Sequence, residues 1–368
     1  MLGPEKWKIG VKASILLSLG LMFLILAGST WDYSNSSKFC ATCHTMEFVT
    51  SSYSTSPHAE VSCTSCHLGV GFAPVMLFKK ATEVNQVVKN VTGTYDKPIR
   101  IRNEIHVDKS CERCHYTKVF YDQRLKVNHS FALDEENTPI KSVMLFNTGG
   151  GPKAWGIHWH VENRIVYGKD GEGKIVHIEL ETADGEQGIY TRLNSSQPVA
   201  FKQMDCVDCH NRVAHRIFNP EKVVDEYLSN EKLPPLPYIK RELTGMLAEA
   251  KDQPPEIWGQ EFTKISDYYR QNYPQVYNES KDVINQLPQL LQEMASQILF
   301  PEMKVTWETY RDSLSHEGCF KCHNTEFQLE TAKSSSGLPQ AIRMDCQICH
   351  SMPVTAKGEG QTITIQLK

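Results

Sequence analysis

Six short cysteine repeats carry the residues of this sequence that could do chemistry. In the first of them, FCATCHTM, two residues separate Cys40 from Cys43, and His44 follows at once. All 12 cysteines of the 368-residue chain lie in such repeats, and each repeat ends in a histidine: Cys40/Cys43/His44, Cys63/Cys66/His67, Cys111/Cys114/His115, Cys206/Cys209/His210, Cys319/Cys322/His323 and Cys346/Cys349/His350.

The histidine after each pair decides between three chemistries. Cys-x-x-Cys alone suits zinc, disulfide exchange or covalent haem, but only haem attachment needs a histidine directly after it. With 14 histidines among 368 residues, a given position is a histidine about 4% of the time, so six matches have odds on the order of 10⁻⁹. The pattern therefore predicts six covalently bound haem c groups, with zinc sites combined with disulfides as the alternative.

Six haem irons with six ligands each need twelve axial ligands, and the motif histidines supply at most half of them. The number of remaining histidines is close to the number of axial positions still to be filled. These eight histidines are His58, His106, His129, His158, His160, His177, His215 and His316. This balance favours a series of bis-histidine haems, whose saturated iron passes electrons without binding a substrate.

The remaining histidines differ in their position relative to the motifs. We expect four histidines that lie within a few residues of a motif to be distal ligands: His58, His106, His215 and His316. His129 lies farther from any motif and is a further candidate. His158 and His160 would share one face of a strand, where one would bind iron and the other pack or hydrogen-bond. His177 lies in a predicted hairpin and is expected to be structural.

Met46 stands two residues after His44 and has two interpretations. A thioether that binds haem iron raises the reduction potential relative to imidazole and is weakly held, so the first haem would differ from the others. Alternatively, Met46 packs on the face of the haem.

The N-terminal segment predicts export of the rest of the chain. Nineteen residues without charge lie between Lys12 and Asp32, about the length that crosses a hydrocarbon core. Basic residues precede this run and aromatic residues follow it, as in an anchor whose N-terminus stays cytoplasmic. A cleaved signal peptide is the alternative, with Ala27-Gly28-Ser29 as the processing site.

The remaining sequence predicts a mainly α and irregular multihaem cytochrome with one N-terminal transmembrane helix, a small β-rich insertion and a C-terminal helical and dihaem extension. An amphipathic helix is expected from near Pro74. RIVYGKDGEGKIVHIELET has the pattern of a hairpin, and the apolar residues of the helix at Leu287–Ile298 predict a core face. We expect residues 1–12 to be cytoplasmic, 13–31 to be the anchor, 32–140 to hold haems 1–3, 141–200 to be β-rich, 201–219 to hold haem 4, 220–300 to be helical, 301–354 to hold haems 5 and 6, and 355–368 to be a loose tail.

Composition excludes several function classes. The net charge of −4 argues against nucleic acid as a partner, because phosphate binding needs a basic surface. TGGGP at Thr148 lacks the Lys-Ser/Thr of a phosphate loop. The chain also has no Gly-x-Ser-x-Gly hydrolase elbow.

Four stretches together with the single apolar segment resemble the NapC/NirT family of membrane-anchored multihaem quinol dehydrogenases: FCATCHTM, SPHAEVSCTSCH, CERCH and DCVDCHNRVAH. The resemblance covers about residues 1–115 and 200–216. It implies that Met46 binds the first haem iron and leaves the opposite position weakly held or open near the quinol. It also implies crosswise ligation, with His58 serving the haem of His210 and His215 serving the haem of His67.

The resemblance further implies a quinol site beside the first haem, built from a lysine and an acid on the helix after the second motif. Lys79 falls at the lysine position, whereas the acid position holds Gln86 and the nearest acid is Glu83. Quinol oxidation releases two protons with two electrons, so a base must lie within reach.

The chain also has six motifs where short family members have four. LFPEMKVTWETYRDSLSHEGCFKCH is similar to the C-terminal part of longer members with additional haems, so the last two motifs are interpreted as an extension of the haem series.

We therefore expect a single-pass protein of the bacterial inner membrane, with its haem domain in the periplasm. It would act as a quinol dehydrogenase, taking electrons from menaquinol or ubiquinol and passing them to a periplasmic redox protein or reductase. Assembly into a homo- or hetero-oligomer stays open. One alternative is a catalytic reductase of the nitrite or hydroxylamine type with one open haem near His158 and His160. Another is a secreted cytochrome that polymerises into a conducting wire after cleavage following Ser29.

Overall fold

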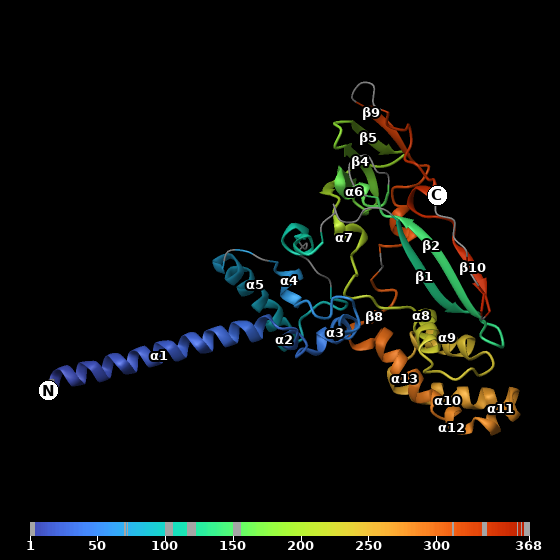
Figure 1. Cartoon of the computed structure of the whole chain (residues 1–368), viewed down its shortest axis with the longest axis horizontal. Coiled ribbons are helices and arrows are strands. Elements are labelled where there is room, and N and C mark those ends of the chain that lie inside the picture. Colours follow the sequence, from blue (N-terminus) through green and yellow to red (C-terminus); the bar gives the residue numbers. More distant parts are fainter. Residues whose placement is uncertain are drawn as a thin grey trace.

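The computed structural model describes residues 4–69, 71, 73–99, 106–115, 123–149, 156–310, 313–332, 337–358, 360–361 and 363. A long N-terminal helix projects from a body that has β-sheets on one side and a group of helices on the other (Figure 1). The fold is mixed, with a long apolar helix, sheets in the middle and a separate group of helices, as the sequence predicts.

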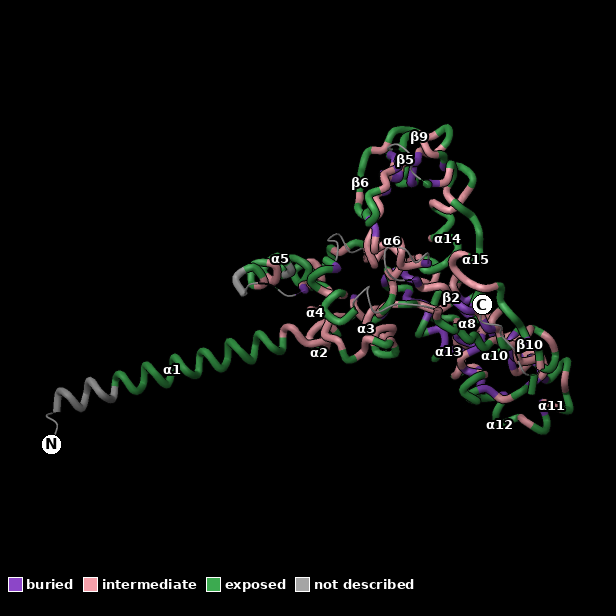
Figure 2. Tube along the Cα trace, turned by 45° about the horizontal axis from the view of Figure 1, so that its top comes forward, coloured by how far each residue is buried: buried purple, intermediate pink, exposed green. Residues whose placement is uncertain are grey.

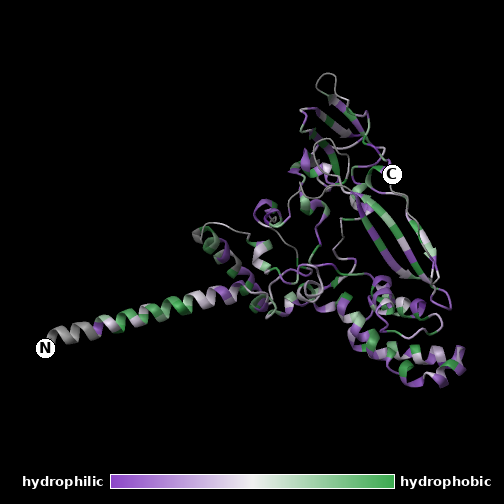
Figure 3. Ribbon diagram, in the orientation of Figure 1, coloured by the Kyte–Doolittle hydropathy of each residue, from purple (hydrophilic) through white to green (hydrophobic). Residues whose placement is uncertain are grey.

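Helix α1 (Pro4–Asn35) carries the apolar segment. Its candidate membrane span, Lys12–Asn35, has a mean hydropathy of 2.0, and none of this span is buried within the protein. Figure 2 colours most of the described part of this helix as exposed, and Figure 3 shows its middle as hydrophobic. Because so much exposed apolar surface is unfavourable in water, this helix is consistent with a membrane anchor or a signal sequence.

The helices that follow α1 and extend through the first three motifs are α2 (Ser37–Cys40), η1 (His44–Met46), α3 (Glu47–Ser54), α4 (Cys63–His67), α5 (Ala73–Thr92), η2 (Val107–Lys109) and η3 (Cys111–Arg113). The hydroxyls of Ser36 and Ser62 accept backbone N–H groups at the starts of α2 and α4. Such caps satisfy helix-end donors where little hydrophobic core is present. Helix α5 begins beside Pro74, which confirms the predicted amphipathic helix.

The strands form two larger sheets and one short pair. One sheet has the order β1-β2-β10, the second has the order β6-β3-β4-β5-β9, and β7 pairs with β8. Their bounds are β1 (Gln123–Phe131), β2 (Pro139–Asn147), β3 (Arg164–Lys169), β4 (Ile175–Glu181), β5 (Gln187–Arg192), β6 (Ala200–Gln203), β7 (Leu299–Phe300), β8 (Val305–Thr306), β9 (Phe327–Ala332) and β10 (Val354–Lys357).

Two predicted boundaries are wrong in this region. The β-structure begins at Gln123, ahead of residue 141, and it also recruits β9 from between the last two motifs and β10 from beyond them. Residues 354–357, expected at or within a loose tail, pair with residues 140–143 of β2. An edge strand exposes unpaired backbone groups, so a distant segment that satisfies them is held in place.

The predicted hairpin forms between β3 and β4. Its turn is held by the Asp170 carboxylate, which accepts the N–H groups of Glu172 and Lys174 at 3.0 and 2.9 Å. Gly173 has a φ of +83°, a conformation that side chains with a Cβ rarely adopt. The turn sequence therefore fixes the register of the two strands.

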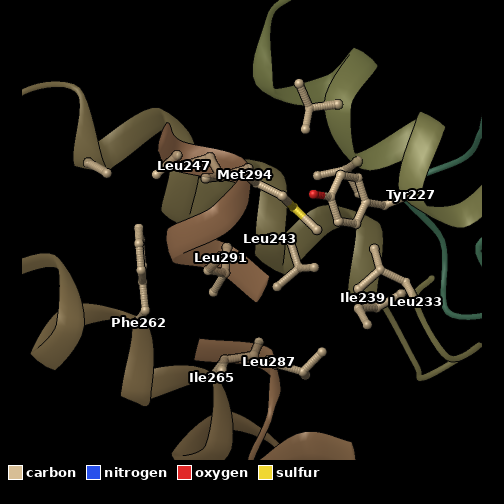
Figure 4. Packing of buried hydrophobic residues seen from close by; sticks show 14 of the residues in the cluster. Tyr227, Leu233, Ile239, Leu243, Leu247, Phe262, Ile265, Leu287, Leu291 and Met294 are labelled. Carbon is tan, nitrogen blue, oxygen red and sulfur yellow. The ribbon is translucent and has the colours of Figure 1, made fainter. Parts of the chain in front are cut away.

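The region between the fourth and fifth motifs is a helical domain with the largest hydrophobic core. Its helices are α8 (Pro220–Ser229), α9 (Ile239–Ala250), α10 (Pro255–Asn272), α11 (Pro274–Glu279), α12 (Lys281–Ile284) and α13 (Leu287–Ile298). Figure 4 shows Leu243 and Leu247 of α9 facing Leu291 and Met294 of α13. The predicted apolar face of α13 is confirmed as core packing.

A smaller cluster joins the two ends of the haem-bearing chain. Phe48 of α3 packs against Phe300, with ring centroids 5.9 Å apart, and stacks on Tyr310 at 5.8 Å. After η5 (Pro301–Met303), the chain continues through α14 (His316–Cys319) and α15 (Cys346–Cys349), which carry the last two motifs. The first motif is thereby anchored to residues near position 300.

Candidate haem sites

The backbones of the second to sixth motifs are tight helical turns. The N–H of four motif histidines donates to the carbonyl of the first cysteine at 2.8–3.1 Å: His115, His210, His323 and His350. His67 ends α4 within the same kind of turn. Asp205 and Asp345 cap the turns of the fourth and sixth motifs, which explains their shared Met-Asp-Cys sequence.

The twelve cysteines are thiols available for attachment. None of them forms a disulfide. Within the described ranges, no three His, Cys, Asp or Glu side chains are grouped in the way a bound metal ion would need. The histidines meet in pairs instead.

The cysteines are not equally covered by the protein. Cys114, Cys319 and Cys346 are exposed, whereas the other nine are half-buried. Cys114 lies just after the short turn η3, and its N–H donates to the Cys111 carbonyl at 3.2 Å. Because the turn ends there, the protein gives Cys114 less cover than Cys111 of the same motif. The motif spacing predicts which cysteines can react but not how deeply each of them is buried.

Five motif histidines lie opposite a second imidazole. The ring centroids are 6.1 Å apart for His67 and His215, 6.0 Å for His115 and His58, 6.4 Å for His210 and His158, 5.6 Å for His323 and His160, and 5.9 Å for His350 and His316. Two imidazoles that bind one iron from opposite sides, through nitrogens at about 2 Å, have centroids about 6 Å apart. The pairs therefore fit haem irons held by two histidines.

Hydrogen bonds to the other ring nitrogen support this fit. The Nδ1 atoms of His160, His323 and His350 lie 2.8, 2.6 and 2.8 Å from the backbone carbonyls of Ile157, Arg343 and Ser351. A carbonyl oxygen only accepts, so each Nδ1 carries the proton and each Nε2 keeps its lone pair. A second partner of this kind orients a metal-binding histidine and raises its basicity.

The environment favours the neutral form of two of the partner imidazoles. Burial, and after it the charge of the neighbouring motif histidine, lower the pKa of His160 and lower that of His215 to about 4. A neutral imidazole is the form that binds iron.

The pairing corrects three expectations. His58 lies opposite His115 rather than His210, so that half of the crosswise ligation is wrong, whereas His215 does lie opposite His67. His158 and His160 are on the helical turn α6 (Trp159–Glu162) and its cap rather than on a strand. Both of them, not one, face a motif histidine.

Three other histidines have no such partner among the described residues. His106 and His129 are exposed, and no ring contact joins either to a motif histidine within the described part of the chain. His177 bonds Glu179 at 3.2 Å on β4, in keeping with the structural role expected for it.

Consecutive motifs are neighbours in space. A hydrogen bond from the Cys40 thiol lowers the pKa of Cys63 to about 6. Burial and then the charge of a cysteine in the adjoining motif raise the pKa of four others: Cys66 beside Cys111, Cys206 beside Cys111, Cys209 beside Cys319 (to about 11), and Cys349 beside Cys319. The motifs thus follow one another from first to sixth.

The first motif differs from the rest. The Nε2 of His44 lies 3.0 Å from the hydroxyl of Tyr95. Met46 is half-buried at the end of η1.

The predicted quinol residues lie on α5. Lys79 donates to the Leu68 carbonyl at 3.4 Å, Gln86 is exposed, and the side chain of Glu83 lies outside the described residues. Sequence reasoning missed Lys80, which donates to the Asn35 Oδ1 at 2.6 Å and lies 5.1 Å from the Trp31 ring. Burial lowers the pKa of Lys80, and nearby Cys40 partly offsets that effect. Lys80 therefore joins α5, the end of α1 and the first motif.

Replacing His160 should convert one haem from low-spin to high-spin, because His323 would be left as a single protein ligand. His160→Ala is expected to produce a high-spin signal for one haem in electron paramagnetic resonance. His177→Ala is the matched control and should leave all signals unchanged. Equal spectra for the two variants would show that His160 is not a ligand.

Comparisons with known proteins find c-type cytochromes of similar sequence. Residues 4–138 match the NapC/NirT cytochrome c family, N-terminal region, and residues 280–351 match cytochrome c554 and c-prime. The chain is 32% identical over 370 residues to the cytochrome c-type protein ImcH of Geobacter sulfurreducens, covering 95% of this chain and 70% of that protein. It is 27% identical over 115 residues to the cytochrome c nitrite reductase subunit NrfH of Nitratidesulfovibrio vulgaris, covering 31% of this chain and 70% of that protein. No solved structure matches.

Proposed function

The chain belongs to the NapC/NirT family of multihaem c-type cytochromes, and we propose on that basis that it is a membrane-anchored quinol dehydrogenase with six haems. It would take electrons from membrane quinol at the first haem and deliver them to a periplasmic acceptor. The observation that carries the proposal is the unbroken sequence of neighbouring motifs that begins where the apolar helix ends.

The cysteines and paired histidines are the groups that would hold the haems. The twelve thiols would form the thioethers, and the five imidazole pairs would bind five of the irons. When bound, the haems supply one-electron carriers of differing potential. Because both axial positions of five irons would be filled, the arrangement favours electron transfer over substrate reduction at those sites.

The quinol would bind where α5 meets the end of α1. Lys80 lies beside Trp31, which is near the end of the apolar span, so it could donate a hydrogen bond to a quinol oxygen near the bilayer surface. Lys79, Glu83 and Gln86 are the further groups proposed for this site. Oxidation of one quinol releases two electrons and two protons, so bound haems would supply the electron acceptors and a base within reach would have to accept the protons.

Removal of Lys80 tests this site. Lys80→Ala should slow reduction of the haems by a menaquinol analogue roughly a hundredfold, the order of effect of a positioned proton-transfer or hydrogen-bonding group. Reduction by dithionite should be unchanged. Lys89→Ala, on the last turn of the same helix, is the control and should behave as the parent protein.

The function itself is tested with the parent protein in liposomes. Addition of a reduced menaquinol or ubiquinol analogue should reduce the haems, and comparison of the two identifies the quinone type. Haems that dithionite reduces but neither quinol reduces would remove the proposal.

A further inference from the structure

His44 is bound in a way that no other motif histidine of the described chain shares. Its Nε2 lies 3.0 Å from the Tyr95 hydroxyl, and the two ring centroids are 6.0 Å apart at an interplanar angle of 65°. In the other five motifs the corresponding imidazole faces a second imidazole.

The backbone of the first motif also departs from the others. Cys43 is extended, with φ −96° and ψ 127°, so the helical turn stops before His44. His44 starts a new 3₁₀ turn, and its N–H is not among those that donate to the first cysteine of the motif. His44 is therefore not carried back over its cysteines by the turn that places the other motif histidines.

Tyr95 is held in position from outside the motif. Its ring packs on the cluster formed by Phe48, Phe300, Met303 and Val305. The Lys97 ammonium lies 5.3 Å from the ring, and the Tyr310 hydroxyl donates to the Ile99 carbonyl at 2.5 Å. These contacts fix both the ring and the segment that follows it.

We propose that Tyr95 is a positioning residue for the first haem: its hydroxyl retains the Nε2 of His44, so the Met46 thioether is the protein ligand of that iron. The inference rests on the proposed attachment of a haem to Cys40 and Cys43. Nε2 is the atom that a motif histidine offers to iron, and it cannot bind a phenol and an iron at once in either tautomer.

The short turn between the two residues suits this exchange. In a 3₁₀ helix successive side chains are about 120° apart, so Met46 projects about 120° away from His44. A histidine directed to Tyr95 therefore leaves the methionine directed elsewhere. Methionine ligation raises the haem potential, so Tyr95 would set the potential of the haem that receives electrons first.

Tyr95→Phe tests the proposal, because it removes the hydroxyl and keeps the ring in its cluster. We expect the midpoint potential of one haem to shift to a more negative value. We also expect the high-spin electron paramagnetic resonance signal of one haem to change as His44 takes the iron in place of the Met46 thioether. Tyr33→Phe removes an exposed hydroxyl beside Phe39, just ahead of the first motif, and should change neither.

Replacement of Met46 supplies the second readout. Met46→Leu should leave one iron without a protein ligand while Tyr95 is present, and so change its high-spin signal. Met46→Leu combined with Tyr95→Phe should instead give the signal and midpoint potential of Tyr95→Phe alone, through His44. Unchanged spectra and potentials in Tyr95→Phe, or an equal change in Tyr33→Phe, would overturn the proposal. Both readouts use an electrode or dithionite, so they are independent of whether quinol reduces the protein.

Discussion

Removal of the fourth haem should stop electrons at the third. In the variant Cys206→Ala/Cys209→Ala, a quinol analogue is expected to reduce the haems of the first three motifs and leave those of the fifth and sixth oxidised. The reason is spatial, since Cys206 adjoins Cys111 of the third motif and Cys209 adjoins Cys319 of the fifth. Visible spectra recorded after addition of quinol, and again after addition of dithionite, measure the haems that quinol reduces and those that only dithionite reduces.

The matched control loses one haem from the end of the series. Cys346→Ala/Cys349→Ala should carry five haems, all of them reduced by quinol, because Cys349 adjoins only the fifth motif among the described cysteine neighbours. If both variants were reduced to the same extent, electrons would not pass through the motifs in chain order.

Lys240→Met should destabilise the helical domain by about 3–5 kcal/mol, because it leaves a buried carboxylate without its partner. The Lys240 ammonium lies 2.8 Å from the Asp225 Oδ1 and also donates to the Phe131 carbonyl, so it joins α9 to α8 and β1. The side chains of Lys240 and Asp225 are only 5% and 7% exposed. Denaturant unfolding followed by far-ultraviolet circular dichroism measures the loss. Lys264→Met, which breaks an exposed pair with Glu261, should cost less than about 1 kcal/mol.

The loss of folding stability in Lys240→Met should depend on pH. Burial already raises the pKa of Asp225, and Lys240 lowers it again, so removal of the lysine moves the folded-state pKa further above the unfolded value. An acid with a raised folded pKa loses stability as pH rises through that pKa. The deficit of Lys240→Met should therefore be largest at pH 7 and smaller near pH 4. A deficit that stayed constant with pH would show that Asp225 does not carry the effect.

Local features of the haem sites could be predicted from the sequence. The cysteine spacing and the motif histidines are set within five residues, so the six attachment sites follow directly from the pattern. The distal ligands do not, because the opposite face of a haem must be covered by a different element. His160 lies 163 residues before its partner His323, whereas His106, only a few residues before the third motif, has no described ring partner.

The same distinction holds for the fold. The apolar face of α13 was predictable, because the 3.6-residue period shows within one helix. The pairing of β10 with β2 was not, since residues 354–357 become a strand only through the exposed edge that β2 offers. The neighbourhood of the motifs depends on such long-range packing, so it could not be predicted from the sequence.

The intact mass of the protein, purified from membranes of a host that matures c-type cytochromes, tests the central claim most directly. The account predicts the whole polypeptide, including residues 13–31, plus six covalent haems on its 12 cysteines. Fewer haems with all cysteines intact, or a chain shortened after Ser29, would contradict an anchored series of six.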